Sequence, residues 1–514
     1  MEDFLLEYGY SLDLIKHDII CSESTRKIRF YSANSAIFLL AYEITSENAY
    51  DISSVYEKNK QDGDEFCSLL LTWHKGEFRC YSKNLKSKQY ILLKDMVAYS
   101  HTSIVNTITS SKIESNRFEN VFYEAHSFLR DLDGLHPDEA LDELCKLIYA
   151  KMYDEESGEN IFSSSVGNGE EYAASIRFLY NKANKYDMRV YALKIPGYKR
   201  SRGVFEEAIF ISSNAIVKAG RLFSKYNFSN ADIDFKARAF QNVYNPATRS
   251  GMGQYFTPIQ VIRFIVSCIS PNLSDLIIDP FAGSAHFLTE SLMYVLPLAD
   301  NEKAKNEFIF YKLHGIEKSE RMVRIAMTDM RLHGDGHSNI RCTDALLPFD
   351  SYTDLSGNSF DIVMTNPPFG SVLQKESYSY LGDFELLKEK NKVPLEILGL
   401  ERSIQLLREG GKLAIVLPES VFVNKSYAYV RTWLQNNVKI RGIISLPLST
   451  FTPFGANIKT SILIATKTKT VENYKIFTGV IEDIGFDSKG NDTKNPDWFE
   501  VAEEFKSFID KEGW

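Results

Sequence analysis

The chain has 514 residues, of which 44% are hydrophobic, and its 59 Lys and Arg against 68 Asp and Glu give a net charge of −9. This length predicts more than one domain, because a single hydrophobic core rarely grows beyond about 250–300 residues. The mildly acidic charge excludes a chain coated in positive charge for nucleic acid. It leaves room for a local basic cleft, or for a partner subunit that makes most of the phosphate contacts.

The six cysteines form neither a CxxC motif nor a Cys/His spacing typical of zinc sites. This pattern indicates a reduced protein without a disulfide framework, and it predicts no metal site. No basic and apolar signal segment opens the sequence, and no apolar run approaches the ~18 residues of a membrane span. We therefore expect a soluble, cytoplasmic protein that does not contact a membrane.

The first part of the chain favours short strands. Residues Cys67 to Trp73 and Phe78 to Tyr81 flank a turn at Lys75-Gly76, which predicts a hairpin. We expect residues 1–112 to form a small α+β module.

Helical periodicity follows this module. After Pro137, which a first helical turn tolerates, Leu141, Leu144 and Ile148 recur at three- and four-residue steps. We expect residues 113–245 to form a helical domain.

Strands and helices then alternate from about residue 246 onward. The runs SDLIID, KLHGIE, FDIVMTN, KLAIVLP, RGIISLP and TSILIATK are typical of buried strands, and ERMVRIAMTDMRLHG and LERSIQLLREGG are typical of helices. This alternation predicts an α/β fold with a mainly parallel, doubly wound, Rossmann-like sheet over residues 246–514, ending in a short polar tail from about residue 472.

Two of these strands, and a third in the run IRCTDAL, are expected to end in an acidic residue. Asp279 precedes a turn with Gly283 and Ser284 at a helix start, which is the usual nucleotide-cradling corner of such sheets. Glu317 suits ribose hydroxyls, and Asp344 suits an adenine amino group. Each residue alone could be part of an ordinary turn or a helix cap. Together, in chain order at one edge of the sheet, they indicate a nucleotide cofactor.

The tetrapeptide Asn366-Pro367-Pro368-Phe369 follows a strand. Because the prolines fix the backbone, we expect the Asn366 side chain and the Pro367 carbonyl to offer two acceptors on one side. Two acceptors can hold both hydrogens of a planar amino group and direct its lone pair at an electrophile. Phe369 offers a surface on which a flat base could stack. The plain alternative is a rigid turn with a buried aromatic ring. Upstream, Thr257 is expected to cap the helix that begins with Pro258.

The segments GQYFTP, DPFAGSAHFL, GIE, DAL and TNPPFG, in this order, resemble the N6-adenine DNA methyltransferases. The resemblance is strongest to the modification subunits of type I restriction–modification systems and their relatives, and it covers roughly residues 115–490. It implies a site-specific, S-adenosylmethionine-dependent methyltransferase that modifies adenine at N6 and acts in restriction–modification or a related antiviral defence.

The resemblance also implies a role for each residue of these motifs. The catalytic residues would be Asn366, Pro367, Pro368 and Phe369, which would hold and stack an adenine flipped out of the duplex. Glu317 would hold the cofactor ribose and Asp344 its adenine. The full set implied to contact S-adenosylmethionine is Gln254, Tyr255, Phe256, Thr257, Pro258, Asp279, Phe281, Gly283, Ser284, Ala285, His286, Glu317, Asp344 and Asn366.

The chain departs from the family pattern at three places. The glycine loop usually continues with Gly-Gly or Ala-Gly, whereas here it reads Ala285-His286, and this histidine could narrow the pocket or point away from it. An insertion of residues 295–308 lengthens the segment between the first two acidic residues. The N-terminal module is not part of an ordinary modification subunit and resembles a module of restriction subunits. Its nearest match to a nuclease Glu-x-Lys reads Glu43-Ile44-Thr45, so we predict that it does not cleave DNA.

The expected partners follow from the same resemblance. Only about 25 residues follow the segment IGFDSKGND, too few for the target-recognition domain of an independent methylase. The resemblance therefore implies a separate specificity subunit, two copies of this chain per complex, double-stranded DNA as the substrate, and a restriction subunit as a further candidate partner. Two alternatives stay open, namely a methylase of protein glutamine or of an RNA base, and a defence component that binds cofactor or DNA without turnover.

Overall fold

The computed structural model describes only part of the chain. In the N-terminal region it describes the backbone of six strands, and further on it describes residues 120–164, 168–194, 208–229, 236, 239–240, 243, 257–334, 339–352, 354–381, 383–388, 390–454, 457–468 and 473–514. Three predicted site residues, Gln254, Tyr255 and Phe256, lie outside these ranges. The chain divides into two compact units, one of residues 1–115 with 156–158 and one of the remainder, and each is described by itself.

The N-terminal unit contains a six-stranded sheet whose strands follow one another in chain order. They are β1 (Lys16–Ser22), β2 (Thr25–Tyr31), β3 (Ile37–Ile44), β4 (Leu69–His74), β5 (Glu77–Lys83) and β6 (Tyr90–Leu92). Neighbouring strands are antiparallel except β3 and β4. The predicted hairpin is confirmed as β4 and β5, with Trp73 paired to Phe78. The helical part expected of this module lies outside the described residues.

The described part of the second unit begins with the helices α4 (Val121–Asp133), α5 (Pro137–Ser157), α6 (Gly169–Lys194) and α7 (Ser213–Phe223). Pro137 is the first residue of α5, as its missing N–H allows. The Phe122 ring on α4 meets the rings of Phe223, Phe228 and Phe240 edge to face, at centroid distances of 6.1, 5.2 and 6.3 Å. These aromatic contacts form the centre of the helical region.

An eight-stranded sheet forms the rest of the second unit. Its strands are β7 (Ile277–Asp279), β8 (Leu313–Glu317), β9 (Ile340–Cys342), β10 (Phe360–Thr365), β13 (Leu407–Pro418), β14 (Lys439–Ser445), β15 (Thr460–Thr466) and β16 (Phe477–Val480). Their order is β16-β14-β15-β13-β10-β7-β8-β9, and only β15 runs antiparallel to its neighbours. A separate pair, β11 (Val372–Gln374) and β12 (Lys392–Pro394), follows β10 in the chain.

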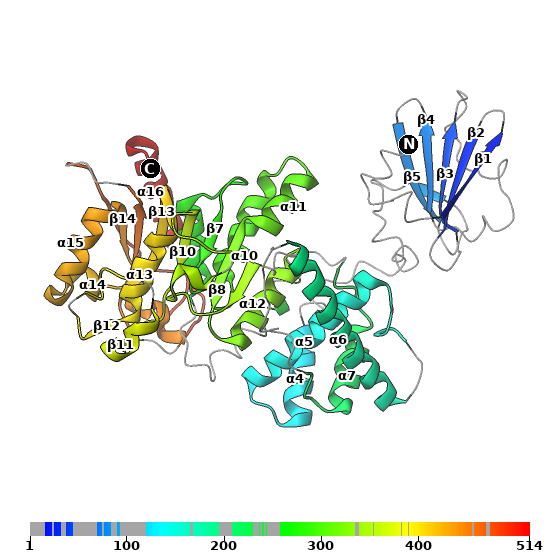
Figure 1. Cartoon of the computed structure of the whole chain (residues 1–514), viewed down its shortest axis with the longest axis horizontal. Coiled ribbons are helices and arrows are strands. Elements are labelled where there is room, and N and C mark those ends of the chain that lie inside the picture. The colour runs from blue at the N-terminus through cyan, green and yellow to red at the C-terminus, as the bar shows by residue number, and fades with distance from the viewer. Residues whose placement is uncertain are drawn as a thin grey trace. The chain divides into compact units, whose positions relative to one another are not determined.

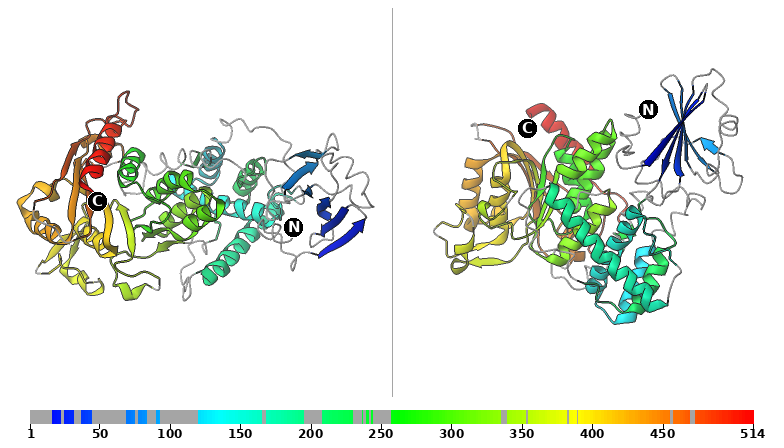
Figure 2. Two further views of the ribbon diagram at one scale, coloured as in Figure 1. Left: turned by 90° about the horizontal axis from the view of Figure 1, so that it is seen from above. Right: turned by 45° about the vertical axis from the view of Figure 1, so that its right-hand side comes forward.

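Helices cover both faces of this sheet. Along a strand, successive side chains point to opposite faces. Ile277 and Ile362 accordingly join one apolar core, with α9 (Ile259–Ile269), α10 (His286–Val295), α12 (Glu320–Leu332) and α16 (Trp498–Glu512). Ile278 and Val363 join the other core, with α13 (Leu395–Leu406) and α15 (Ala428–Asn437). Figures 1 and 2 show the green helices on one side of the sheet and the yellow and orange helices on the other. The doubly wound α/β prediction is confirmed.

Two local predictions need correction. The helix predicted over residues 400–411 ends at Leu406, and Leu407 already belongs to β13. Two glycines follow, and Gly410 takes a φ of +76°, which a helix cannot use. The segment expected to be a polar tail contains β16 and α16, and Phe505 of α16 is buried against Phe477 at a centroid distance of 5.5 Å.

The insertion at residues 295–308 forms a short 3₁₀ turn, η4 (Leu296–Leu298), and part of α11 (Glu302–Tyr311). The side chain of Asn301 accepts a hydrogen bond from the Ala304 N–H and caps α11. Within the ranges given above, no helix is both long and apolar enough to cross a membrane.

Candidate functional site

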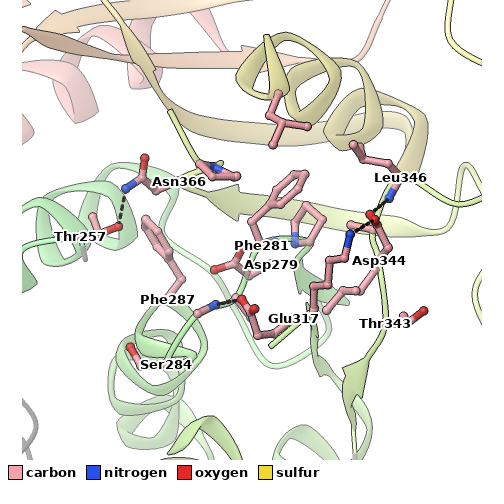
Figure 3. Close-up of a pocket in the computed structure, with 18 of the residues that line it drawn as sticks. Thr257, Asp279, Phe281, Ser284, Phe287, Glu317, Thr343, Asp344, Leu346 and Asn366 are labelled. Carbon is pink, nitrogen blue, oxygen red and sulfur yellow. Dashed lines mark hydrogen bonds and ion pairs between the residues drawn. The ribbon is translucent and has the colours of Figure 1, made fainter. Parts of the chain in front are cut away.

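A cavity of about 410 Å³ lies where β7, β8 and β10 end. The chain order reverses between β7 and its neighbour β10, and open α/β sheets commonly bind ligands at such a point. Of the predicted site residues, the cavity is lined by Thr257, Asp279, Phe281, Gly283, Ser284, His286, Glu317, Asp344, Asn366, Pro368 and Phe369. Three further predicted site residues are buried and do not line the cavity, namely Pro258, Ala285 and Pro367. Figure 3 shows Asn366 and Thr257 at one end and Asp344 and Leu346 at the other.

Asp279, at the end of β7, connects two loops of the cavity wall. Its Oδ1 accepts a hydrogen bond from the Thr365 hydroxyl at 2.6 Å and another from the Phe281 N–H at 3.0 Å. The residue is 1% exposed, and this burial raises the pKa of its carboxyl to about 7. Asp279 therefore joins the loop after β7 to the end of β10, the strand that leads into Asn366.

Glu317, at the end of β8, supports the glycine loop. Its Oε2 accepts from the Gly283 N–H at 3.1 Å and its Oε1 from the Ser319 N–H at 2.8 Å. Burial raises the pKa of this carboxyl. Figure 3 shows the carboxylate facing the loop below Asp279. A second acceptor on the cavity wall is thus fixed by backbone contacts.

The unusual pair Ala285-His286 forms the start of α10. Ala285 has a φ of +64°, a left-handed conformation that favours glycine. His286 is 9% exposed, and its Nε2 lies 3.8 Å from Oδ2 of Asp329 on α12. Burial lowers the pKa of this imidazole. The ring thus approaches α12, although the residue also contributes to the cavity wall.

Asp344 forms the opposite end of the cavity. Its Oδ2 accepts from the Lys318 ammonium at 2.8 Å, and its Oδ1 accepts from the Leu346 N–H at 3.0 Å. The loop that follows is fixed by Arg402 of α13, which donates through Nη2 to the carbonyls of Leu346 and Leu347. The carboxylate is held in place by Lys318 and by its own loop.

The two polar atoms of the Asn366 side chain differ in their hydrogen bonding. Its Nδ2 donates to the Thr257 hydroxyl oxygen at 2.9 Å. Its Oδ1 is buried and finds no hydrogen-bond partner within the described part of the chain. The prediction that Thr257 caps a helix is wrong, because Pro258 is the N-cap residue and α9 begins at Ile259. Thr257 instead orients an amide whose oxygen is left free.

The residues after Asn366 differ in exposure. Pro367 is buried, whereas Pro368 is exposed. Phe369 is 6% exposed and meets Phe451 edge to face at a centroid distance of 6.1 Å. The ring lines the cavity and is held from the side by a second aromatic residue.

Sequence reasoning missed two residues that shape this site. Thr365 stands directly before Asn366, and a hydroxyl at a strand end next to Asp279 could have been noticed. Gly399 of α13 allows the close approach of Pro367, since a Cβ there would lie 2.7 Å from the Pro367 Cβ. No sequence signal connects Gly399 with Pro367, because their proximity depends on how α13 packs on the loop.

Residues 239–514, more than half of the chain, match the model of the N-6 DNA methylase family. The chain is 28% identical over 294 residues to the type I restriction enzyme EcoEI methylase subunit of Escherichia coli, covering 54% of this chain and 56% of that protein. It is 30% identical over 228 residues to the StySPI methylase subunit of Salmonella potsdam, covering 43% of this chain and 41% of that protein. The match thus spans about half of each relative's length.

Solved structures support the fold. A chain from a study of complex assembly and conformational transition in the type I R-M system gives a TM-score of 0.57 at 19% identity, covering 76% of this chain and 82% of that chain. A type I restriction–modification methyltransferase subunit from Streptococcus thermophilus gives 0.55 at 15% identity, covering 77% and 93%. The family match, the motif order and the fold agree, and the chain belongs to the N-6 DNA methylase family.

Proposed function

We propose that this chain transfers a methyl group from S-adenosylmethionine to N6 of an adenine in double-stranded DNA. The free Oδ1 of Asn366 carries the proposal, because a buried acceptor without a partner is costly unless a ligand fills it. The family match supports a methylase, and the motif residues at the cavity support the choice of an amino group as acceptor of the methyl.

The cavity fits the cofactor in size and in chemistry. Its volume of about 410 Å³ lies within the usual range for ligand sites. Glu317 offers a carboxylate to ribose hydroxyls, and Asp344 offers one to the adenine amino group. Asp279, Phe281, Gly283 and Ser284 also line the cavity and would surround the methionine part. When bound, S-adenosylmethionine supplies an electrophilic methyl group on its sulfonium sulfur.

The residues around Asn366 prepare the target amine. Thr257 holds the amide nitrogen, so the amide oxygen is the atom left to accept a hydrogen from the base. The Pro367 carbonyl is the second acceptor in the proposal, and Phe369 limits the position of the flipped base. With both hydrogens held, the amine lone pair is freed for attack on the methyl group. The methylated ammonium then loses one proton readily, so no strong base is required.

The partners belong to the same proposal. The relatives named above are methylase subunits of type I restriction enzymes. We propose that this chain likewise works with a separate DNA specificity subunit, as two copies per complex, and that a restriction subunit can join them. Such a partner would account for DNA binding by a chain with a net charge of −9.

A methyl-transfer assay tests the proposal. The full chain is incubated with labelled S-adenosylmethionine and unmethylated DNA, with and without its specificity subunit, and N6-methyladenine is quantified. We expect Asn366→Ala to abolish the product. Thr257→Val removes the acceptor for the Asn366 amide and should lower kcat by about tenfold, the cost of one hydrogen bond. Thr257→Ser keeps the hydroxyl and is the matched control.

Other outcomes would replace this function. Label that appears in protein glutamine or in RNA, and is lost in Asn366→Ala, would reassign the substrate. Cofactor binding without transfer to any of these substrates would identify a component that binds without turnover. Full activity in Asn366→Ala would contradict the proposed site.

A further inference from the structure

We infer that Tyr380 contacts the cofactor at its adenine end, and that the segment between Ser371 and Pro394 carries this ring to the cavity. The inference rests on the proposed function, because it names a further binding residue for the same cofactor. None of the motifs that indicate the family includes Tyr380.

The segment is anchored beside Asn366. It follows the proposed catalytic loop, residues 366–369, after Gly370, whose φ is +78°. Its two ends pair as the antiparallel strands β11 and β12, with Val372 opposite Pro394. The Leu395 N–H then donates to the Ser371 carbonyl at 2.9 Å. The two ends of this segment therefore lie side by side, next to the proposed catalytic residues.

The segment between Ser371 and Pro394 also contributes to the cavity wall. Ser371, Leu373 and Tyr380 all line it, and so do Lys318 and Asp344. Tyr380 is the last residue of the short 3₁₀ helix η7 (Lys375–Tyr380), in the middle part of this segment. One segment thus contributes three residues to a cavity wall that Asn366 and Asp344 also form.

Lys318, Asp344 and Tyr380 line the same cavity. The Lys318 ammonium is hydrogen-bonded to Asp344 at 2.8 Å, and this bond raises the pKa of Lys318, with a smaller contribution in the same direction from the Tyr380 phenol. The ammonium that binds the proposed adenine acceptor therefore also has an electrostatic interaction with the Tyr380 phenol. A base bound at Asp344 would meet the Tyr380 ring.

Tyr380 has ring surface to offer. Its side chain is 44% exposed although it lines the cavity, so a flat ligand could cover it without disturbing the core. Aromatic rings stack well on nucleobases, because both are flat and polarisable. The exposure also implies that the side chain can be replaced without unfolding the protein.

Calorimetric titration of the full chain with S-adenosylhomocysteine tests the inference. We expect Tyr380→Ala to raise Kd by about tenfold or more, the loss of one stacking contact. Tyr380→Phe keeps the ring and should bind within about twofold of wild type. Tyr311→Ala is the matched control, since this tyrosine is 57% exposed at the end of α11 and does not line the cavity.

Three results would overturn the inference. An unchanged Kd in Tyr380→Ala, with wild-type binding intact, rejects the contact and leaves the proposed function in place. Unchanged cofactor affinity with weaker binding to a DNA duplex assigns the ring to the DNA surface instead. A wild-type chain that does not bind S-adenosylhomocysteine rejects the proposed function, and the inference falls with it.

Discussion

At the scale of single residues, the hydrogen bond between Asp279 and Thr365 is the most informative contact. It is fully buried and joins two residues that are 86 positions apart. The carboxyl has a pKa near 7, chiefly because burial disfavours its charged form. A charged Asp279 therefore costs folding free energy at neutral pH, and this cost can be measured.

We predict that Asp279→Asn reduces the pH dependence of stability. The carboxyl binds its proton more tightly in the folded chain, with a pKa near 7 against 3.8 in the unfolded chain, so the free energy of unfolding falls as pH rises through this window. Between pH 5 and pH 8 the contribution of this one group is about 2–3 kcal/mol. Urea unfolding of both proteins at the two pH values measures it.

Asparagine retains an acceptor for Thr365 and Phe281, so the variant should fold. Burial also raises the pKa of Glu317 and Glu396, but these groups remain in both proteins. The difference between the two pH dependences therefore isolates Asp279. Equal slopes in wild type and variant would show that the carboxyl titrates near its ordinary value.

The sequence predicts single residues well only where the chain itself places them. Asp279 and Glu317 end the neighbouring parallel strands β7 and β8, and Asp344 follows β9 by two residues, so their convergence follows from the strand pattern, and the structure brings all three to one cavity. Thr257 was interpreted as a local cap, but its hydroxyl accepts from Asn366, 109 residues away. Such a contact depends on tertiary packing. The roles assigned to these residues stay predictions.

At the scale of elements, helix α13 lies against the loop of residues 366–370. A Cβ on Gly399 would come within 2.7 Å of the Pro367 Cβ and 3.0 Å of the Phe281 ring. Both distances are shorter than side chains tolerate, and Pro367 is rigid. The position of the loop therefore depends on a missing methyl group in a helix that lies outside the motif.

We predict that Gly399→Ala displaces the loop and lowers stability by about 1–3 kcal/mol, the usual cost of overpacking. This loss opposes the ~1 kcal/mol that alanine normally gains over glycine inside a helix. Urea unfolding and the methyl-transfer assay measure both effects. Gly169→Ala, at the start of α6, is the control, because its Cβ would make only an ordinary 3.5 Å contact.

If Gly399→Ala raises the free energy of unfolding, as helix propensity alone predicts, the loop can move away from the new methyl group without destabilising the fold. Unchanged methyl transfer would show in addition that Pro367 tolerates the shift. The control variant should keep wild-type activity, since Gly169 lies in the helical region.

Element type was predictable and element ends were less so. The apolar runs predicted the strands β7, β8, β10, β13, β14 and β15 because buried strands of a covered sheet are apolar on both faces. The end of α13 was misplaced because Gln405-Leu406-Leu407 suits a helix equally well. The pairing of Leu407 with Phe360 of β10 starts the strand there, and sequence periodicity does not contain that pairing.

At the scale of the whole molecule, the helical region joins the α/β region through α5 and α12. Arg324 of α12 donates through Nε and Nη2 to the two carboxylate oxygens of Asp142 on α5, at 2.6 and 3.0 Å. Both side chains are buried, at 5% and 8% exposure. Apolar residues of both helices also share one core. The domain boundary predicted between residues 245 and 246 stays a prediction, because one apolar core extends across the helical and the α/β regions.

We predict that Arg324→Ala lowers the free energy of unfolding by about 3 kcal/mol or more, because it leaves a buried carboxylate without its main partner. Arg321→Ala is the matched control on the same two helices. Arg321 pairs with Asp138 where its side chain is 37% exposed, and exposed pairs contribute at most about 1 kcal/mol. Denaturant unfolding compares the two.

Equal losses in the two variants would contradict this prediction. A double-mutant cycle of Arg324→Ala with Asp142→Ala then separates the pair energy from lost packing. A coupling energy near zero would show that the two helices are held together by the shared apolar core alone.

The reversal of chain order between β7 and β10 has a consequence for folding. It makes the site depend on contacts between residues 86 and 109 positions apart, and closing such long loops costs entropy before any contact repays it. We therefore expect helices and local turns to form early, while the amide of Asn366 becomes fixed only in the last steps. A partly folded chain would then have most of its helices and no ordered contacts around Asn366.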